Sequence, residues 1–182
     1  MAYTNQVIYN PENKQQIEFL QTAKDTNGAL LEMNSTYGPF SAQPPSHYHP
    51  YQSEDFLVME GELTIQLGKE IKLLKKGDAI HISKNEPHSM WNNSGEKTIV
   101  NWKVQPALNT EYMFESACNI AIESIHNKRK TTIIQKLTLA RKYKNMFRLA
   151  KPSFIIQRIL FFLLSVVARL LNYKAEYAKY ID

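Results

Sequence analysis

Short alternating segments separated by glycine turns constrain the fold of this chain more than any other feature. Residues 62–67 alternate polar and apolar side chains, as a half-buried strand does. Turns at Gly61, Gly68 and Gly77 separate neighbouring segments of similar length. The predicted strands are residues 55–60, 62–67, 70–74, 79–82, 87–92 and 99–104. Strands of this length and spacing predict an antiparallel sandwich or barrel.

Three histidines and one glutamate occur at a spacing that suits one metal ion. His47 and His49 are two residues apart, so on an extended strand they point to the same face. Glu54 follows a bend at Pro50, and His88 lies on a later strand. Each residue taken singly reads best as a surface side chain, whereas the four together predict a metal site. Imidazole and carboxylate ligands suit iron, manganese, nickel, cobalt or zinc.

Two motifs around these residues resemble those of the cupin superfamily. The first motif is a glycine, a His-x-His pair, a glutamate and a second glycine, here Gly38, His47, His49, Glu54 and Gly61. The second is represented by Gly77-Asp78, Ile82, His88 and Asn92. Ser83 and Asn85 depart from the proline and glycine that are common there. Because asparagine tolerates a left-handed backbone, we expect the turn at Asn85 to be preserved.

The resemblance implies a mainly β fold, a single antiparallel double-stranded β-helix (jelly-roll or cupin barrel). The residues after it, which lie outside the two motifs, are expected to add a C-terminal α-helical extension. The barrel is expected over residues 1–108, with the motif core at about 30–106, and the extension over 109–182. The motifs are similar to those of small single-domain cupins of the quercetin-dioxygenase-like kind. The resemblance also implies one divalent transition metal bound by His47, His49, Glu54 and His88.

The predicted pocket around the metal is apolar and aromatic. Glu54 is the ligand that we expect to act as a catalytic base. Strand parity and position select the remaining lining residues, which are Phe56, Met90, Asn92, Met33, Tyr37, Gln43 and Trp102. No glycine-rich phosphate loop is present and residues 1–126 contain no arginine, so a bidentate phosphate clamp is not expected there. This lining favours a flat or hydrophobic organic substrate over a sugar phosphate.

Several functions fit such a site. The first hypothesis is a metal-dependent dioxygenase-like enzyme that acts on a small aromatic or enolic compound. The alternatives are a non-catalytic ligand-binding or sensing cupin, and a metal-dependent isomerase or epimerase. A purely structural metal is the weaker interpretation, because structural sites are usually closed by four protein ligands in tetrahedral geometry.

The extension is predicted to be helical. A first helix is expected over residues 111–125, capped by Asn109 or Thr110, and a second from Thr131 or Thr132. A third covers residues 154–171 and is followed by a tyrosine-rich tail at 172–177. Only ten residues separate Arg158 from Arg169, too few for a span of about 20 apolar residues. The single cysteine, Cys118, falls on the first helix and is expected to be packed rather than reactive.

Charge divides the chain into an acidic barrel and a basic extension. Residues 1–126 contain 9 lysines against 15 carboxylates, and residues 127–182 contain 13 basic against 2 acidic side chains. We expect residues 127–171 to contact the barrel, a homodimer partner or a membrane surface. Nucleic acid is not expected, because no recognisable module accompanies the basic residues. The lone cysteine and the polar first residues indicate a cytoplasmic protein, either free or peripheral at the inner membrane face.

Overall fold

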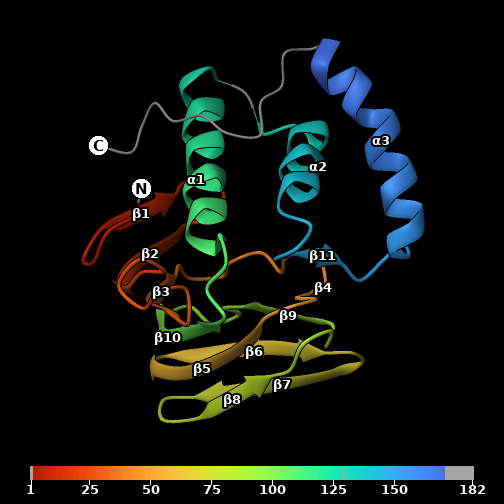
Figure 1. Ribbon diagram of the computed structural model, residues 1–182. Coiled ribbons are helices and arrows are strands. Elements are labelled where there is room, and N and C mark those ends of the chain that lie inside the picture. Colours follow the sequence, from red (N-terminus) through yellow and green to blue (C-terminus); the bar gives the residue numbers. More distant parts are fainter. Residues whose placement is uncertain (1, 129, 171–182) are drawn as a thin grey trace.

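Two antiparallel sheets face each other in the computed structural model, which describes residues 2–128 and 130–170. One sheet has the order β1-β2-β3-β10-β5-β8 and the other the order β11-β4-β9-β6-β7 (Figure 1). The strands are β1 Val7–Asn10, β2 Gln15–Gln21, β3 Leu31–Tyr37, β4 His47–Tyr48, β5 Ser53–Glu60, β6 Glu62–Leu67, β7 Glu70–Lys75, β8 Ala79–Ile82, β9 His88–Trp91, β10 Thr98–Gln105 and β11 Arg148–Leu149. The predicted mainly β, cupin-like fold is confirmed.

The six strands predicted from alternation are all present, with ends within two residues of the expected positions. In β10, alternate residues Val100, Trp102 and Val104 are buried, and those between them are half-buried. This period of two is what a strand with one face in the core requires. β7 is an edge strand, and its lysines keep the exposed edge from pairing with another chain.

Three N-terminal strands extend the larger sheet beyond the predicted segments. β3 pairs with β10 along its whole length, from Leu31 opposite Val104 to Tyr37 opposite Thr98. β2 pairs with β3, and buries Ile17 and Phe19. The alternation of Ile17 and Phe19 with polar residues was a strand signal that the sequence interpretation did not use.

The helices are α1 Thr110–His126, α2 Ile133–Lys142 and α3 Phe154–Leu170. Thr132 caps α2 as predicted, since its hydroxyl accepts a hydrogen bond from the Gln135 amide at 3.2 Å. Asn109 stands at the start of α1 but makes no side-chain capping bond. The expected end of the third helix at residue 171 and the tail at 172–177 lie outside the described residues.

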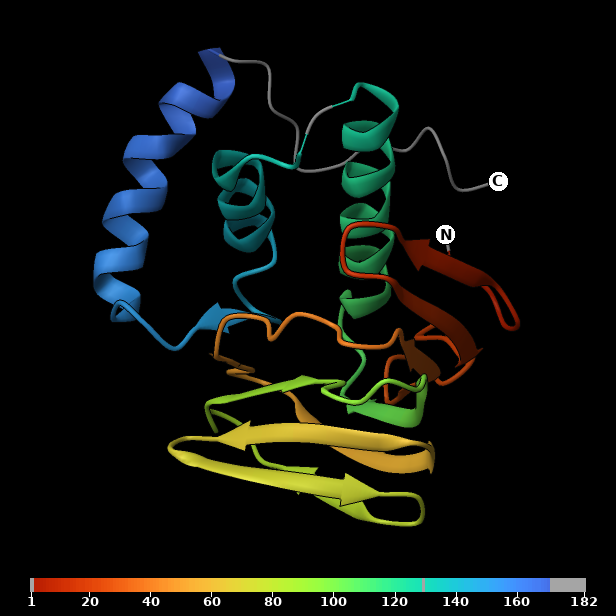
Figure 2. The same cartoon turned by 180° about the vertical axis from the view of Figure 1, so that it is seen from behind.

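All three helices lie on one side of the barrel. In Figures 1 and 2, α1 stands beside β1, α2 stands above β11, and α3 lies beyond α2. Phe114 and Cys118 of α1 join the hydrophobic core of the barrel. Burial raises the pKa of Cys118 to about 12, which agrees with the expected packed and unreactive thiol. Across the described residues, no helix is both long and apolar enough to cross a lipid bilayer.

Candidate metal centre

The four predicted ligands converge from three strands of the two sheets. His47 begins β4 and pairs across the sheet with His88, the first residue of β9. His49 lies just beyond the end of β4, which contains only His47 and Tyr48. Glu54 comes from β5 in the opposite sheet. The two sheets thereby bring together residues that are up to 41 positions apart in the sequence.

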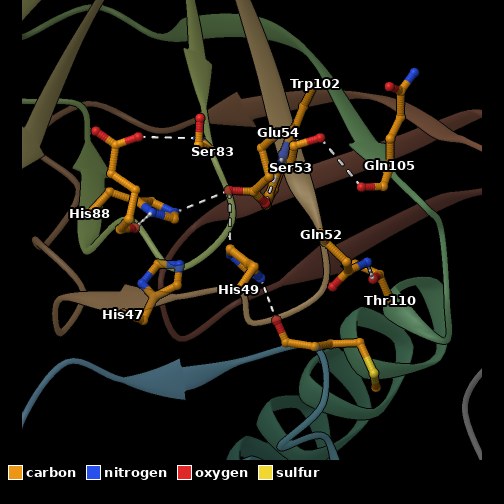
Figure 3. A network of polar contacts seen from close by, with 12 residues as sticks. His47, His49, Gln52, Ser53, Glu54, Ser83, His88, Trp102, Gln105 and Thr110 are labelled. Carbon is orange, nitrogen blue, oxygen red and sulfur yellow. Dashed lines mark hydrogen bonds and ion pairs between the residues drawn. The ribbon is translucent and has the colours of Figure 1, made fainter.

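The ligand atoms lie close enough together to share one ion. The three histidines each offer a ring nitrogen, and these nitrogens lie within 4.8 Å of one another. Glu54 Oε2 lies 3.3 Å from His49 Nε2 and 3.1 Å from His88 Nε2 (Figure 3). His49, Glu54 and His88 are buried, while His47 is half-buried and lies toward the solvent side.

Backbone carbonyls hold all three imidazole rings in the same way. His47 Nδ1 lies 3.1 Å from the Pro45 carbonyl and His88 Nδ1 lies 2.9 Å from the Glu86 carbonyl. His49 Nδ1 bonds the Met146 carbonyl. A carbonyl only accepts, so each Nδ1 carries the proton and each Nε2 of a neutral ring keeps its lone pair. This is the arrangement in which protein histidines bind metals through Nε2.

Trp102 orients the carboxylate in the same manner. Its indole Nε1 donates to Glu54 Oε1 at 3.2 Å, while Oε2 faces the histidines (Figure 3). The bond separates the roles of the two oxygens, one held by the barrel and one available as a ligand. Trp102 is itself fixed between the rings of Phe56 and Phe114, at centroid distances of 5.1 and 5.2 Å.

The buried donor atoms that face one another would be satisfied better by a divalent metal than by each other. His49 Nε2, Glu54 Oε2 and His88 Nε2 are buried without a hydrogen-bond partner among the described residues. Buried polar atoms without partners cost about 1–3 kcal/mol each, and they seldom cluster. One cation placed among them would satisfy all three, and the set of imidazole and carboxylate donors suits a first-row transition metal.

Burial and the neighbouring side chains shift the pKa values of His47, Glu54 and His88. Desolvation, followed by repulsion from His88 and His49, lowers the pKa of His47 to about 3, so its ring is neutral at physiological pH. Burial alone would raise the pKa of Glu54, but the neighbouring histidines outweigh burial and lower it. Burial would lower the pKa of His88, yet the adjacent Glu54 carboxylate raises it. The cluster therefore favours an ionised Glu54 carboxylate beside His88, while His47 stays neutral.

A cavity of about 600 Å³ opens onto the four ligands. Of the predicted pocket residues, Tyr37, Gln43, Met90 and Trp102 line it. Burial raises the pKa of Tyr37, so its phenol stays protonated and can donate a hydrogen bond into this cavity.

Three predicted pocket residues do not line the cavity. Met33 and Phe56 are part of the hydrophobic core, because their strands turn these side chains into the space between the sheets. The Asn92 amide instead donates to the carbonyls of Gly38 at 3.1 Å and Glu96 at 2.6 Å, which fixes the loop that follows β9. Strand parity selected Phe56 and Asn92, but it does not give the depth at which a side chain lies.

The C-terminal extension contributes to the centre in a way that sequence reasoning missed. Met146 supplies the carbonyl that orients His49, and the ring of Phe147 stacks on His47 at a centroid distance of 4.7 Å. β11 then pairs with β4, with Leu149 opposite His47. A backbone carbonyl carries no sequence signal, so only the fold could reveal this contact.

A further histidine–carboxylate pair on the barrel lies apart from this cluster. His81 is exposed on β8 and its Nδ1 lies 2.7 Å from Asp55 Oδ1. It takes no part in the metal centre, as the sequence interpretation expected. The last histidine, His126, ends α1.

Two facing antiparallel sheets bring three histidines and a glutamate to one buried point, where they could hold a metal ion. Residues 35–102 match the family model described as a cupin domain. This part of the chain therefore resembles a cupin domain. Its sequence is 37% identical over 67 residues to quercetin 2,3-dioxygenase of Bacillus subtilis (strain 168), a stretch that covers 36% of this chain and 19% of that enzyme.

Solved structures show the same fold at low sequence identity. A predicted oxalate decarboxylase from Thermotoga maritima superposes with a TM-score of 0.50 and 20% identity, over 57% of this chain and 92% of that one. An RmlC-like cupin from Shewanella frigidimarina gives a TM-score of 0.50 and 19% identity, over 61% of this chain and 94% of that one. These similarities concern the fold alone.

Proposed function

We propose that this chain is a metal-dependent, dioxygenase-like enzyme that acts on a small aromatic or enolic compound. The observation that carries the proposal is the convergence of three oriented imidazoles and one carboxylate oxygen at the floor of a cavity. The local similarity to quercetin 2,3-dioxygenase and the aromatic cavity wall support this choice of chemistry. A bound divalent metal would act there as a Lewis acid toward an enol, catechol or carbonyl oxygen of the substrate.

The residues of the chain would bind and orient such a substrate. The carbonyls of Pro45, Glu86 and Met146 hold the three ligand rings in position, so they need no reorganisation when metal or substrate binds. Tyr37, as a neutral phenol on the cavity wall, would donate a hydrogen bond to a substrate oxygen. Glu54 would serve first as an anionic ligand. Its lowered pKa makes it a weak base, so the proposed proton transfer to Glu54 would require a substrate proton made acidic by the metal.

Oxygen consumption tests the proposal directly. Protein loaded separately with Fe(II), Mn(II), Ni(II) or Co(II) is expected to consume oxygen in the presence of a flavonol or a 1,3-diketone. The His49→Ala variant should lose this activity and His81→Ala, which alters a histidine outside the cluster, should keep it. If no metal and substrate in a broad panel supports consumption above the metal-free control, the dioxygenase proposal fails.

Two alternatives give different results in the same experiment. A metal-dependent isomerase or epimerase would convert its substrate without oxygen, so product would form equally under anaerobic conditions. A non-catalytic ligand-binding or sensing cupin would bind the flavonol or diketone, with a change in thermal stability, but would return it unaltered. Product analysis with and without oxygen therefore distinguishes the three functions.

A homodimer partner and a membrane surface remain predictions for the extension. α3 exposes several large apolar side chains, which are Ile155, Ile156, Ile159, Leu160 and Phe162. Basic residues accompany them, as on helices that lie on anionic membranes. Sedimentation with anionic and with neutral vesicles, together with the molar mass in solution, separates these partners. Binding to anionic vesicles alone supports the membrane surface, and a vesicle-independent dimer supports the second copy.

A further inference from the structure

A second cavity of about 450 Å³ lies beside the metal centre, and most of its wall lies outside the matched cupin domain. It is enclosed by β2 of the barrel, by α1 and by α2, the helices that stand side by side in Figures 1 and 2. Its wall is almost wholly apolar. Ile17 comes from β2, Ala117 and Ile120 from α1, and Leu137 and Ala140 from α2. A volume of this size is in the range that binds small organic molecules.

This apolar chamber borders the metal cavity. Met113, Phe114 and Phe147 line both spaces. Phe147 also stacks on His47, so one aromatic ring separates a metal ligand from the chamber. The tail of a molecule bound at the metal would pass Phe147 to reach the space between the two helices.

The chemistry of the chamber selects an uncharged tail. The charged residues on its wall, Glu12 and Lys136, pair with each other at 3.0 Å and are partly exposed at the rim. Cys118 lines the interior, and burial keeps its thiol protonated by raising its pKa to about 12. Hydrocarbon placed in such a space loses its contact with water, which favours its binding.

We propose that the chamber binds the alkyl or aryl tail of a molecule whose metal-chelating head occupies the cupin cavity. This inference rests on the proposed metal-dependent function and narrows its substrate class to amphiphiles. The helical extension then has two tasks at the same site. It orients His49 through the Met146 carbonyl, and it provides the walls that hold the tail.

A series of alkyl hydroxamates of increasing length tests the inference on the full chain loaded with one divalent metal. Acetohydroxamate supplies the chelating head alone, and longer members add methylenes that should enter the chamber. Affinity measured by calorimetry should rise about threefold to fourfold for each added methylene up to the capacity of the chamber. The Ala140→Trp variant fills the chamber from α2, and should flatten the series while acetohydroxamate binds as in the wild type.

Arg141→Trp is the matched control, because it adds the same ring at the neighbouring, exposed position of α2. It should keep the wild-type dependence on chain length. Ala117→Trp repeats the test from α1, in case Ala140→Trp does not fold as judged by circular dichroism. A flat series in the wild type, or a gain with length that survives both chamber variants, overturns the inference. If acetohydroxamate itself fails to bind, the proposed function fails and the inference falls with it.

Discussion

At the scale of single residues, the candidate centre depends on which atom of each side chain is already engaged. Trp102 occupies Glu54 Oε1, and backbone carbonyls occupy Nδ1 of His47, His49 and His88. The remaining donor atoms have lone pairs that point to one place. Orientation of this kind usually contributes to metal affinity almost as much as the ligands do.

Trp102→Phe tests the role of the indole donor. The variant keeps an aromatic ring between Phe56 and Phe114 but removes the hydrogen bond to Glu54 Oε1. We expect metal affinity to fall by about 10- to 100-fold, the usual cost of losing such an orienting partner. Competition with a metal-sensitive dye measures the affinity. Trp91→Phe alters the only other tryptophan, which lies off the cavity wall, and should leave it unchanged.

Glu115 gives a pH-dependent prediction away from the metal. It is buried on α1, one turn after Glu111, and its Oε1 has no hydrogen-bond partner among the described residues. Burial raises its pKa above the ordinary value of 4.5, so the folded protein favours the protonated carboxyl. The wild type therefore loses stability as pH rises from below 4.5 through the raised pKa of the folded state.

The Glu115→Gln variant has no carboxyl group at this position, so it does not lose stability in this way as pH rises. The stability of the variant relative to the wild type should be least favourable at about pH 4 and should increase toward about pH 8. At about pH 8, removal of the like charges of Glu111 and Glu115 should add about 0.2–0.5 kcal/mol. Urea unfolding at both pH values gives the difference. Glu96→Gln, at an exposed position, should show no such trend. A gain for Glu115→Gln that is equal at both pH values would contradict the argument.

At the scale of elements, the sequence predicted the features that depend on only a few neighbouring residues. The alternation in residues 62–67 gave β6, and Thr132 gave the start of α2. Asn85 adopts a left-handed backbone with φ of 64°, as its place in the second motif led us to expect. The ligand set was predictable because both motifs are short and continuous. Gly61 is a turn residue whose identity is required by its backbone conformation and by the atoms around it.

Gly61 joins β5 to β6 with φ of 77°, and a Cβ there would lie 2.5 Å from the Lys97 carbonyl oxygen. Gly61→Ala should therefore cost more than the roughly 1–2 kcal/mol of a left-handed backbone alone. Gly68 is the matched control, since its φ is also positive at 55° but a Cβ would meet nothing within 4 Å. Chemical denaturation of both variants gives the two costs. Equal losses would show that the contact with Lys97 has no effect.

At the scale of the whole molecule, the barrel and the extension meet at the metal centre. Sequence patterns could not show this, because the meeting point is a backbone carbonyl 97 residues after His49. Nor could they show how deep Met33 and Phe56 lie, since that depends on how the two sheets pack. Tyr143 fixes the junction. Its hydroxyl lies 3.0 Å from Ser116 Oγ on α1, and its carbonyl accepts from the Met146 amide at 2.8 Å.

Tyr143→Phe removes only that hydroxyl. We expect the free energy of unfolding to fall by about 0.5–1.5 kcal/mol, the usual worth of a buried hydrogen bond. Metal affinity should fall less than in Trp102→Phe, because the Met146 carbonyl is loosened rather than lost. Thermal melting and the dye competition measure the two effects. Tyr9→Phe, on the exposed face of β1, should change neither. Wild-type stability in this variant would show that the Tyr143 hydroxyl does not stabilise the junction.

The metal content of the purified protein tests the central claim most directly. Elemental analysis of wild type, His49→Ala and His81→Ala, each checked for folding by circular dichroism, compares a cluster histidine with one outside it. We predict close to one equivalent of a divalent transition metal in wild type and His81→Ala, and a large loss in a folded His49→Ala. A wild type that holds no such metal even after incubation with Fe(II), Mn(II), Ni(II), Co(II) and Zn(II), or a His49→Ala variant that retains a full equivalent, would contradict the account.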